Sequence, residues 1–338
     1  MPLEKQFEAI ASAPKTWTVF EKLKKTVPGA INFNYDPHKC DNIPYILYDM
    51  SIQSKEGEAK VVRVIRVGTP TRQRTDYNSM TWQGAAQIIP EFETFTGALT
   101  LLHKKLLFLS LQDDHERLIG SETERNRALH KLQQKFSNTF YLGILSHDSA
   151  FYYQTGEFSQ MDEADIFLNT FKKMLCGERN GYHLPSEWLQ NADFTAGIGT
   201  ILEELHEDLF EKKKSFILLE RLGFIDIAYA RLALSFLKHS GADFLIFCCK
   251  DSMDRAGKCN AILFKIILIL IRKEEDEAYK RKFHVDIHAA TLFVKEQVMN
   301  NRRERLLLAL SLLERPLVKE RLRKRQPSIG INGLLSSD

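Results

Sequence analysis

The sequence has no strong excess of charge of either sign. Its 338 residues include 47 lysines and arginines against 44 aspartates and glutamates, a net charge of +3. The chain as a whole is therefore not a polycation, and any anion must be bound by a local patch. There is also no stripe of cations interleaved with aromatic residues and no recognised binding motif, so we expect no nucleic-acid partner.

Cysteine is scarce, and long apolar runs are absent. The five cysteines are odd in number and lack metal-ligand spacing, which favours a reducing compartment over a disulfide framework; they are Cys40, Cys176, Cys248, Cys249 and Cys259. The longest apolar run, around 262–271, is too short to span a bilayer, and the first residues open no signal peptide. The histidines form no convincing metal set. We expect a monomeric cytosolic protein without metal or cofactor.

Apolar runs of strand length alternate with helical patterns over most of the chain. Strands are expected at 44–52, 60–67, 105–111, 139–145 and 244–247, and helices at about 3–27, 92–104, 116–136, 163–175, 200–213 and 224–239. Beyond residue 271 the pattern is helical, over 287–302 and 303–313, with Pro316 as a stop. We predict one domain over 1–325, with an α/β sheet flanked by helices to about 273, an α-helical part at 274–325, and a disordered tail at 326–338.

One stretch combines a cysteine and an arginine in a setting that suits anion chemistry. Cys249 and Arg255 are separated by five residues, with the strand at 244–247 before them and an apolar helix pattern at 261–271 after them. A strand that feeds a helix through a tight loop aims backbone N–H groups and the positive end of the helix dipole at one point. We expect the pKa of Cys249 to fall from about 8.5 to roughly 3.5–7.5 in such a loop.

Each residue of this loop can be given a role in phosphoryl chemistry. Cys249 is then a nucleophile at neutral pH, and Arg255 grips two phosphoryl oxygens with its planar guanidinium. Lys250 adds a cation for a second phosphate or for a lipid diester. Gly257 lets the backbone approach closely. Ser252 and Met253 complete the predicted substrate-binding residues.

The leaving alcohol of a phosphate ester needs a proton donor. Asp254 and Asp251 are the carboxyl groups inside the loop, and either one can serve as the acid. The alternative is that both only orient Arg255 and the loop amides. Asp148 and Asp193 are candidates on other loops, although aspartate at such positions more often caps a turn.

The form Cys-x-Asp-x-x-Asp-Arg, carried here by Cys249, Asp251, Asp254 and Arg255, resembles the signature loops of the Sac and myotubularin phosphoinositide phosphatases. The longer motif Cys-Lys-Asp-x-x-Asp-Arg-x-Gly looks most like that of the SidP-type effector phosphatases of Legionella. The resemblance covers this loop and its strand–loop–helix context. It implies a cysteine-phosphatase-like sheet, a phosphocysteine intermediate, and action on the 3-phosphate of phosphatidylinositol 3-phosphate and 3,5-bisphosphate.

The loop departs from the Sac and myotubularin pattern at one position. Those enzymes have threonine after the arginine, and here the residue is Ala256. The missing hydroxyl normally helps the sulfur leave the phospho-enzyme, so rapid hydrolysis of the intermediate is in question, although its formation is not. Ser252 is a possible substitute within the loop.

We expect a cysteine-dependent phosphoinositide phosphatase that binds the lipid headgroup and works at a membrane surface. If the protein is a bacterial effector, it is secreted into the host cytoplasm. Two alternatives stay open: a soluble inositol polyphosphate phosphatase, and a catalytically weak phosphoinositide-binding pseudophosphatase. A fourth hypothesis is that Cys249 is only a redox-sensitive thiol next to Cys248, a role that does not require Arg255. The basic runs 302–305 and 319–325 either dock on anionic lipid or form a solvated helix face, and interspersed glutamates favour the latter.

Overall fold

The computed structural model describes residues 45–54, 57–72, 85–114, 121–177, 181–284 and 300–335. The helix expected at 3–27 lies outside these ranges, as do Cys40 and most of the helix expected at 287–302. Within the described ranges, no helix is both long enough and apolar enough to cross a bilayer.

Seven strands form one mixed sheet in the order β7-β6-β5-β8-β2-β1-β9. The strands are β1 (Tyr45–Gln53), β2 (Ala59–Arg66), β5 (Leu106–Ser110), β6 (Phe140–Leu145), β7 (Tyr182–His183), β8 (Phe244–Cys248) and β9 (Ile331–Leu335). The central strands β6, β5, β8 and β2 run parallel. The pairs β6–β7, β2–β1 and β1–β9 are antiparallel, so β7 and β1 run against the central strands and β9 runs with them. A separate two-stranded sheet joins β3 (Thr71–Arg72) to β4 (Gln87–Ile88). The predicted α/β class and its five strands are confirmed.

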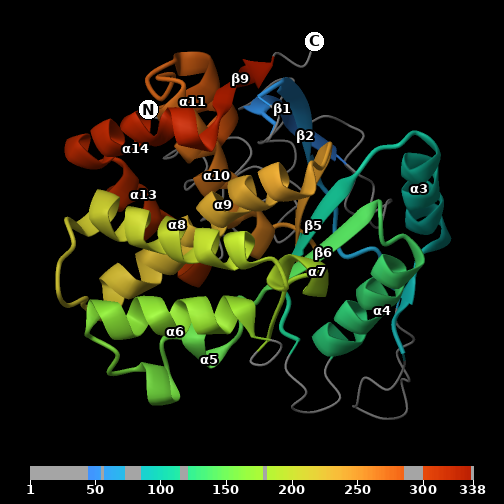
Figure 1. Ribbon diagram of the computed structural model, residues 1–338, viewed down its shortest axis with the longest axis horizontal. Helices are drawn as coiled ribbons and strands as arrows, with labels where there is room; N and C mark the ends of the chain where they lie inside the picture. Colours follow the sequence, from blue (N-terminus) through green and yellow to red (C-terminus); the bar gives the residue numbers. More distant parts are fainter. Residues whose placement is uncertain are drawn as a thin grey trace, which may run out of the picture.

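Helices cover both faces of the sheet (Figure 1). One face carries α3 (Pro90–Leu101) and α4 (Ser121–Lys135), whose apolar side chains share a core cluster with that face of the strands. The other face carries a larger core cluster, with residues from α5 (Ala150–Tyr153), η1 (Gly156–Phe158), α6 (Ala164–Cys176), α7 (Ser186–Leu189), α8 (Ala192–Phe210), α9 (Leu218–Ser240), α10 (Arg255–Leu270), α13 (Asn300–Leu313) and α14 (Pro316–Ile329). Partly buried residues of α11 (Glu277–His284) pack against it.

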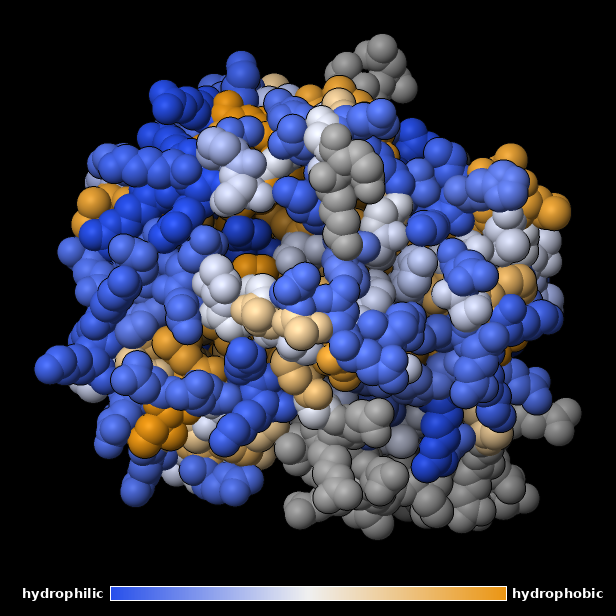
Figure 2. All heavy atoms as spheres, viewed as in Figure 1, coloured by the Kyte–Doolittle hydropathy of each residue, from blue (hydrophilic) through white to orange (hydrophobic). Residues whose placement is uncertain are grey.

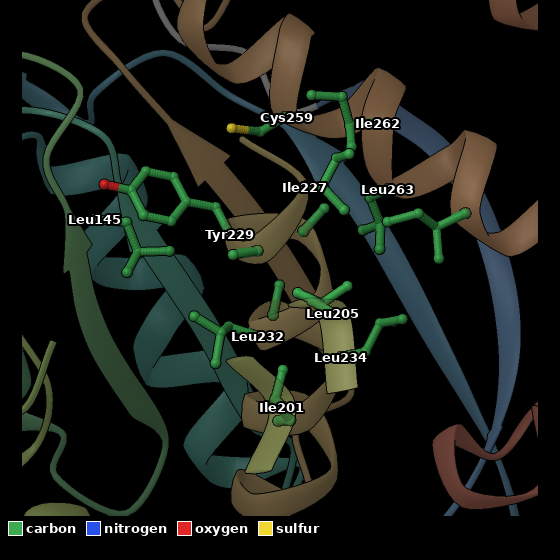
Figure 3. Packing of buried hydrophobic residues seen from close by; sticks show 14 of the residues in the cluster. Leu145, Ile201, Leu205, Ile227, Tyr229, Leu232, Leu234, Cys259, Ile262 and Leu263 are labelled. Atoms are coloured by element: carbon green, nitrogen blue, oxygen red, sulfur yellow. The ribbon is translucent and has the colours of Figure 1, made fainter. Parts of the chain in front are cut away.

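The sequence of β8 shows why it belongs at the centre of the sheet. Its interior residues are apolar, and alternate side chains face alternate layers, as strand geometry requires. Leu245 and Phe247 join the larger cluster, whereas Ile246 and Cys248 join the cluster under α3 and α4. Figure 3 shows residues of the larger cluster, among them Ile227 and Leu232 of α9 and Cys259 and Ile262 of α10. Cys248 and Cys249 therefore lie on opposite sides of the sheet, and Cys248 is fully buried in the core.

The C-terminal part differs from the prediction of helices followed by a disordered tail. Residues 326–329 complete α14, and residues 331–335 form β9, which pairs antiparallel with β1. Gly330 ends the helix in the left-handed conformation at φ 77°, which glycine adopts without steric cost. The edge of β1 offers a row of unpaired backbone groups on which another strand can form. Pro316 also begins a helix rather than merely stopping one, because proline is well placed in a first helical turn.

Candidate active site

The predicted loop lies at the carboxyl edge of the sheet, where the chain changes from one face to the other. The strands β5 and β8 are parallel neighbours; β5 continues toward α4 on one face, and β8 continues through the loop to α10 on the other. In open α/β sheets, ligands bind in the crevice outside such a switch point. The strand–loop–helix context expected for Cys249 and Arg255 is confirmed, since β8 ends at Cys248 and α10 begins at Arg255.

Cys249 is fully buried in the resting structure, and its thiol is not activated. The sulfur donates a hydrogen bond to Asp254 Oδ1 at 3.4 Å, and the amide of Ala256 points at it from the first turn of α10. Burial raises the pKa of the Cys249 thiol to about 11, and the Asp254 carboxylate adds to the rise, while Arg255 and the Ala256 amide oppose it. The expected fall in this pKa is wrong for this state, because removal from water outweighs the helix dipole and the arginine.

Arg255 is buried beside the loop and held by acids. Its Nη2 lies 2.6 Å from Glu122 Oε1, its Nη1 lies 3.2 Å from Glu122 Oε2, and a second ion pair joins Nη1 to Asp148. Nη1 also donates to the carbonyl of Leu111 at 3.2 Å. The guanidinium is thus turned inward, as an anion-binding role requires. Its Nε is buried and has no hydrogen-bond partner among the described residues, so one donor is left for a ligand oxygen.

Asp148 connects the loop to the C-terminal helical part. Its Oδ1 accepts from the Tyr153 hydroxyl at 3.1 Å and from Arg302 Nη2 at 3.3 Å, while Oδ2 pairs with Arg255. The Arg302 guanidinium also lies 5.8 Å from the centre of the Tyr153 ring, and its Nε lies 3.8 Å from Asp254 Oδ2. Two guanidinium groups and three carboxylates, including Glu122, therefore meet beside Cys249.

The structure distinguishes the two acids inside the loop. Asp254 contacts the sulfur; burial favours its neutral form, but the amide of Arg255 and the charges of Arg255 and Arg302 hold its pKa below the ordinary value. Asp251 instead acts electrostatically on Arg125 of α4, on the other side of the loop. Asp254 is therefore the carboxylate placed for proton exchange with Cys249. Asp193 lies in the first turn of α8, which Asn191 caps.

The remaining predicted loop residues differ in how exposed they are and in the contacts they make. Lys250 is exposed, and its carbonyl accepts from the amide of Thr69 at 3.1 Å. Met253 is buried, with 2% of its surface exposed. Ser252 adopts φ 50° and directs its hydroxyl at the carbonyls of Val67 and Phe247. The Ser252 hydroxyl donates its hydrogen to these carbonyls and not to the Cys249 sulfur. The idea that Ser252 replaces the missing hydroxyl is therefore wrong for this conformation.

Within the described chain, Gly257 is not required for close packing, and its role beside a bound anion stays a prediction. A Cβ atom at Gly257 would meet Arg66 Nη2 at 3.9 Å, which is ordinary van der Waals contact. Ala256 is fully buried and belongs to the larger core cluster. The position where the Sac and myotubularin enzymes have a threonine hydroxyl is here an apolar packing site.

A buried charge cluster fixes the helix that carries Arg302. Asp226 of α9 pairs with Lys258 of α10 through Oδ1 and with Arg305 of α13 through Oδ2, the latter at 2.8 Å. Arg305 also donates to the carbonyls of Tyr152 and Leu222, at 3.3 and 3.0 Å. Because these bonds join four elements, the start of α13 cannot move without leaving buried charges unpaired.

Sequence reasoning missed Glu122, Arg302 and Tyr153 as members of the site. Arg302 was assigned to a basic run, whether membrane-bound or solvated, yet Arg302 and Arg305 point inward. The run 319–325 is largely paired with acids, for example Arg325 with Glu207 at 3.2 Å. Lys104 and Lys105 lie before β5, at the opposite edge of the sheet from Cys249, and so add no charge to the loop. No local pattern marks the missed residues, because they reach Arg255 only through the tertiary fold.

The described part of the chain contains no group of three or more histidine, cysteine, aspartate or glutamate side chains arranged to hold a metal ion. Comparison of the chain with protein-family models, with curated proteins and with solved structures finds no match. The functional argument therefore depends on the site itself.

Proposed function

We propose that the protein is a cysteine-dependent phosphatase that removes a phosphate from phosphoinositides through a phosphocysteine intermediate. One observation carries the proposal: Cys249, Asp254 and Arg255 converge at the start of α10, with the Ala256 amide directed at the sulfur. Nucleophile, proton acceptor and phosphate-binding cation thus occupy one loop at a switch point of the sheet.

The resting arrangement is the closed state of this site. Asp148 and Glu122 occupy the guanidinium of Arg255, and Cys249 has no exposed surface. A phosphoryl group that enters must take the place of one carboxylate. Asp148 is the one exchanged, because Glu122 binds Arg255 through both oxygens and also accepts from the Asp113 amide at 2.9 Å. Glu122 then keeps the guanidinium oriented while Arg255 binds the substrate.

The proton path follows from the Cys249–Asp254 hydrogen bond. As the thiol attacks phosphorus, its proton passes to the Asp254 carboxylate, and the S–P bond forms while the bond to the inositol oxygen breaks. Protonated Asp254 then donates that proton to the leaving oxygen. A single carboxyl group, already one of the two candidate acids in the loop, thereby serves as base and acid in turn. Arg255 and the Ala256 amide bind the phosphoryl oxygens and the sulfur while charge is redistributed.

Water completes the reaction by attacking the phosphocysteine, with its proton accepted by Asp254 or Asp148. The S–P bond breaks and the Cys249 sulfur regains a proton. At this step the departing sulfur lacks the hydroxyl donor that a threonine in place of Ala256 would supply, so dephosphorylation is expected to be slower than phosphorylation.

The substrate class rests on the resemblance of the loop and on the cations beside it. The resemblance favours the 3-phosphate of phosphatidylinositol 3-phosphate and 3,5-bisphosphate. Lys250, which is exposed in the loop, and Arg302, whose contact with Asp148 is lost as Asp148 moves, are the cations proposed to meet a second phosphate. They favour a highly charged headgroup, which soluble inositol polyphosphates also provide.

The test is phosphate release from a panel of phosphoinositides and their free headgroups, with Cys249→Ser as the inactive variant. Wild type should release phosphate and form a phosphocysteine detectable by mass spectrometry after acid quench, and Cys249→Ser should do neither. Comparison of a short-chain lipid with its free headgroup separates the lipid substrate from the soluble one. Equal inactivity of wild type and Cys249→Ser on every compound would remove the enzyme proposal.

A second function, binding of phosphoinositides without turnover, is favoured by two observations. The Cys249 thiol has a pKa of about 11 in the closed state, and Ala256 supplies no hydroxyl. A pseudophosphatase of this kind would bind the headgroup through Arg255 and either release no phosphate or remain as a stable phosphocysteine. Substitution of Arg255 by glutamine would abolish its binding, whereas Cys249→Ser would leave binding intact.

A further inference from the structure

Three consecutive apolar residues are exposed where α9 begins. Ile217, Leu218 and Leu219 have 59%, 46% and 55% of their surfaces exposed, whereas their neighbour Phe216 is buried at 1%. Phe216 anchors the segment in the core, so the three residues after it are held outward on an ordered turn. An exposed cluster of large apolar residues at one point of the surface marks a contact site more often than a scattered single residue does.

The same segment carries consecutive lysines. Lys212, Lys213 and Lys214 directly precede it, and all three are exposed. The nearby acids pair partly with these lysines and partly with arginines: Glu220 with Lys213 at 2.9 Å, Glu207 with Lys212 at 3.9 Å and with Arg325 at 3.2 Å, and Glu211 with Arg321 at 3.2 Å. The segment therefore combines apolar side chains with exposed lysines, of which Lys213 is held by Glu220 and Lys212 lies at the long end of ion-pair range from Glu207.

The segment leads into α9, whose later residues contact the helices that carry Arg255 and Arg302. Leu218 precedes Asp226 by eight residues on α9, which corresponds to about 12 Å along the helix. Asp226 in turn contacts Lys258, one turn after Arg255, and Arg305, one turn after Arg302. In Figure 1 the segment is the yellow loop between α8 and α9 at the left, and Figure 2 shows hydrophobic side chains among hydrophilic ones in that part of the view.

We propose that residues 212–219 are a membrane-docking segment, in which Ile217, Leu218 and Leu219 enter the headgroup region of an anionic bilayer while Lys212 and Lys214 contact lipid phosphates. A bilayer is the occupant that fits, because a projecting turn of aliphatic side chains beside lysines matches an apolar layer under an anionic surface. The inference rests on the proposed function in one respect, since it makes the lipid in a membrane, rather than a free headgroup, the substrate.

The experiment measures sedimentation with vesicles of phosphatidylcholine, with and without phosphatidylserine. All proteins carry Cys249→Ser, so that binding is separated from turnover. The docking variants are Leu218→Ser/Leu219→Ser and Lys212→Glu/Lys214→Glu. Each should lower the partition onto phosphatidylserine vesicles by about tenfold or more, because either buried apolar area or several attractive charges are removed.

The chain offers a matched control at the opposite edge of the sheet. Leu101 and Leu102 are 83% and 67% exposed, precede a histidine and a lysine, and lie where β5 begins rather than where it ends. Leu101→Ser/Leu102→Ser should leave the partition unchanged. The proposal is overturned if the parent protein does not bind anionic vesicles, which is the result expected if the surface binds a protein instead. It is also overturned if the docking variants bind vesicles as well as the parent does, or if the control variant loses as much vesicle binding as the docking variants.

Failure of this inference is distinguishable from failure of the proposed phosphatase. With an otherwise wild-type chain, the docking variants should hydrolyse a short-chain phosphoinositide in solution as fast as the parent and lose activity only on vesicles. Vesicle binding without phosphate release would overturn the phosphatase and keep the docking surface. Hydrolysis of the dispersed lipid without vesicle binding would support the phosphatase and overturn the docking surface.

Discussion

Removal of the Asp254 charge should lower the pKa of Cys249, and the structure sets the size of the effect. The carboxylate oxygen lies 3.4 Å from the sulfur, so the repulsion between carboxylate and thiolate is about 5 kcal/mol at an effective dielectric of about 20. That corresponds to roughly three to four pKa units. Burial, the largest cause of the raised pKa, remains in Asp254→Asn, and solvent reaches part of the Asp254 side chain. We therefore expect a fall of about two units, from the present value of about 11.

The assay is the ultraviolet absorbance of the thiolate as a function of pH. Subtraction of the curve of the matching Cys249→Ser protein isolates the one thiol, because the other cysteines and the tyrosines titrate in both. Asp251→Asn is the control, since Asp251 acts on Arg125 rather than on the sulfur, and it should leave the pKa of Cys249 unchanged. A Cys249 pKa in Asp254→Asn that equals or exceeds the wild-type value would refute the assignment of Asp254 as the proton partner.

Three further predictions concern the stability of the fold. Asp226→Ala leaves Lys258 and Arg305 buried without their shared carboxylate and should lower the free energy of unfolding by about 3–5 kcal/mol in urea titrations, and a smaller loss would show that water replaces the pair. The folded pKa of Cys249, about 11, exceeds the unfolded value of about 8.5, so this group stabilises fully below pH 8.5 and the contribution is lost as the pH rises to 11. Wild type should therefore lose about 3 kcal/mol relative to Cys249→Ser across that interval, and parallel curves would contradict the raised pKa. Ile331→Asp places a charge at a position 1% exposed in β9 and should lower the melting temperature and increase amide exchange in β1, whereas unchanged exchange would show that β9 contributes nothing to the edge.

The α/β class and the strand–loop–helix arrangement around Cys249 were predictable because their determinants are local. The apolar run of β8, the short loop and the apolar helix after it are encoded within residues 244–271, and pairing with β2 and β5 only had to place them together. The spacing of Cys249 and Arg255 likewise predicted that both lie at one helix start. β9 escaped prediction because its five residues form a strand only by contact with β1, far away in the sequence.

The chemical state of the loop was decided by tertiary structure alone. Sequence indicated an activated thiolate, but the burial of Cys249 and the charge of Asp254 depend on how α10 packs, and together they leave a neutral thiol. Arg302 looked like surface charge until the cluster around Asp226 turned its helix inward toward Asp148. Spacing along a chain determines which groups can share a loop, whereas solvation and partner charges, which set a pKa, come from residues that only folding brings near.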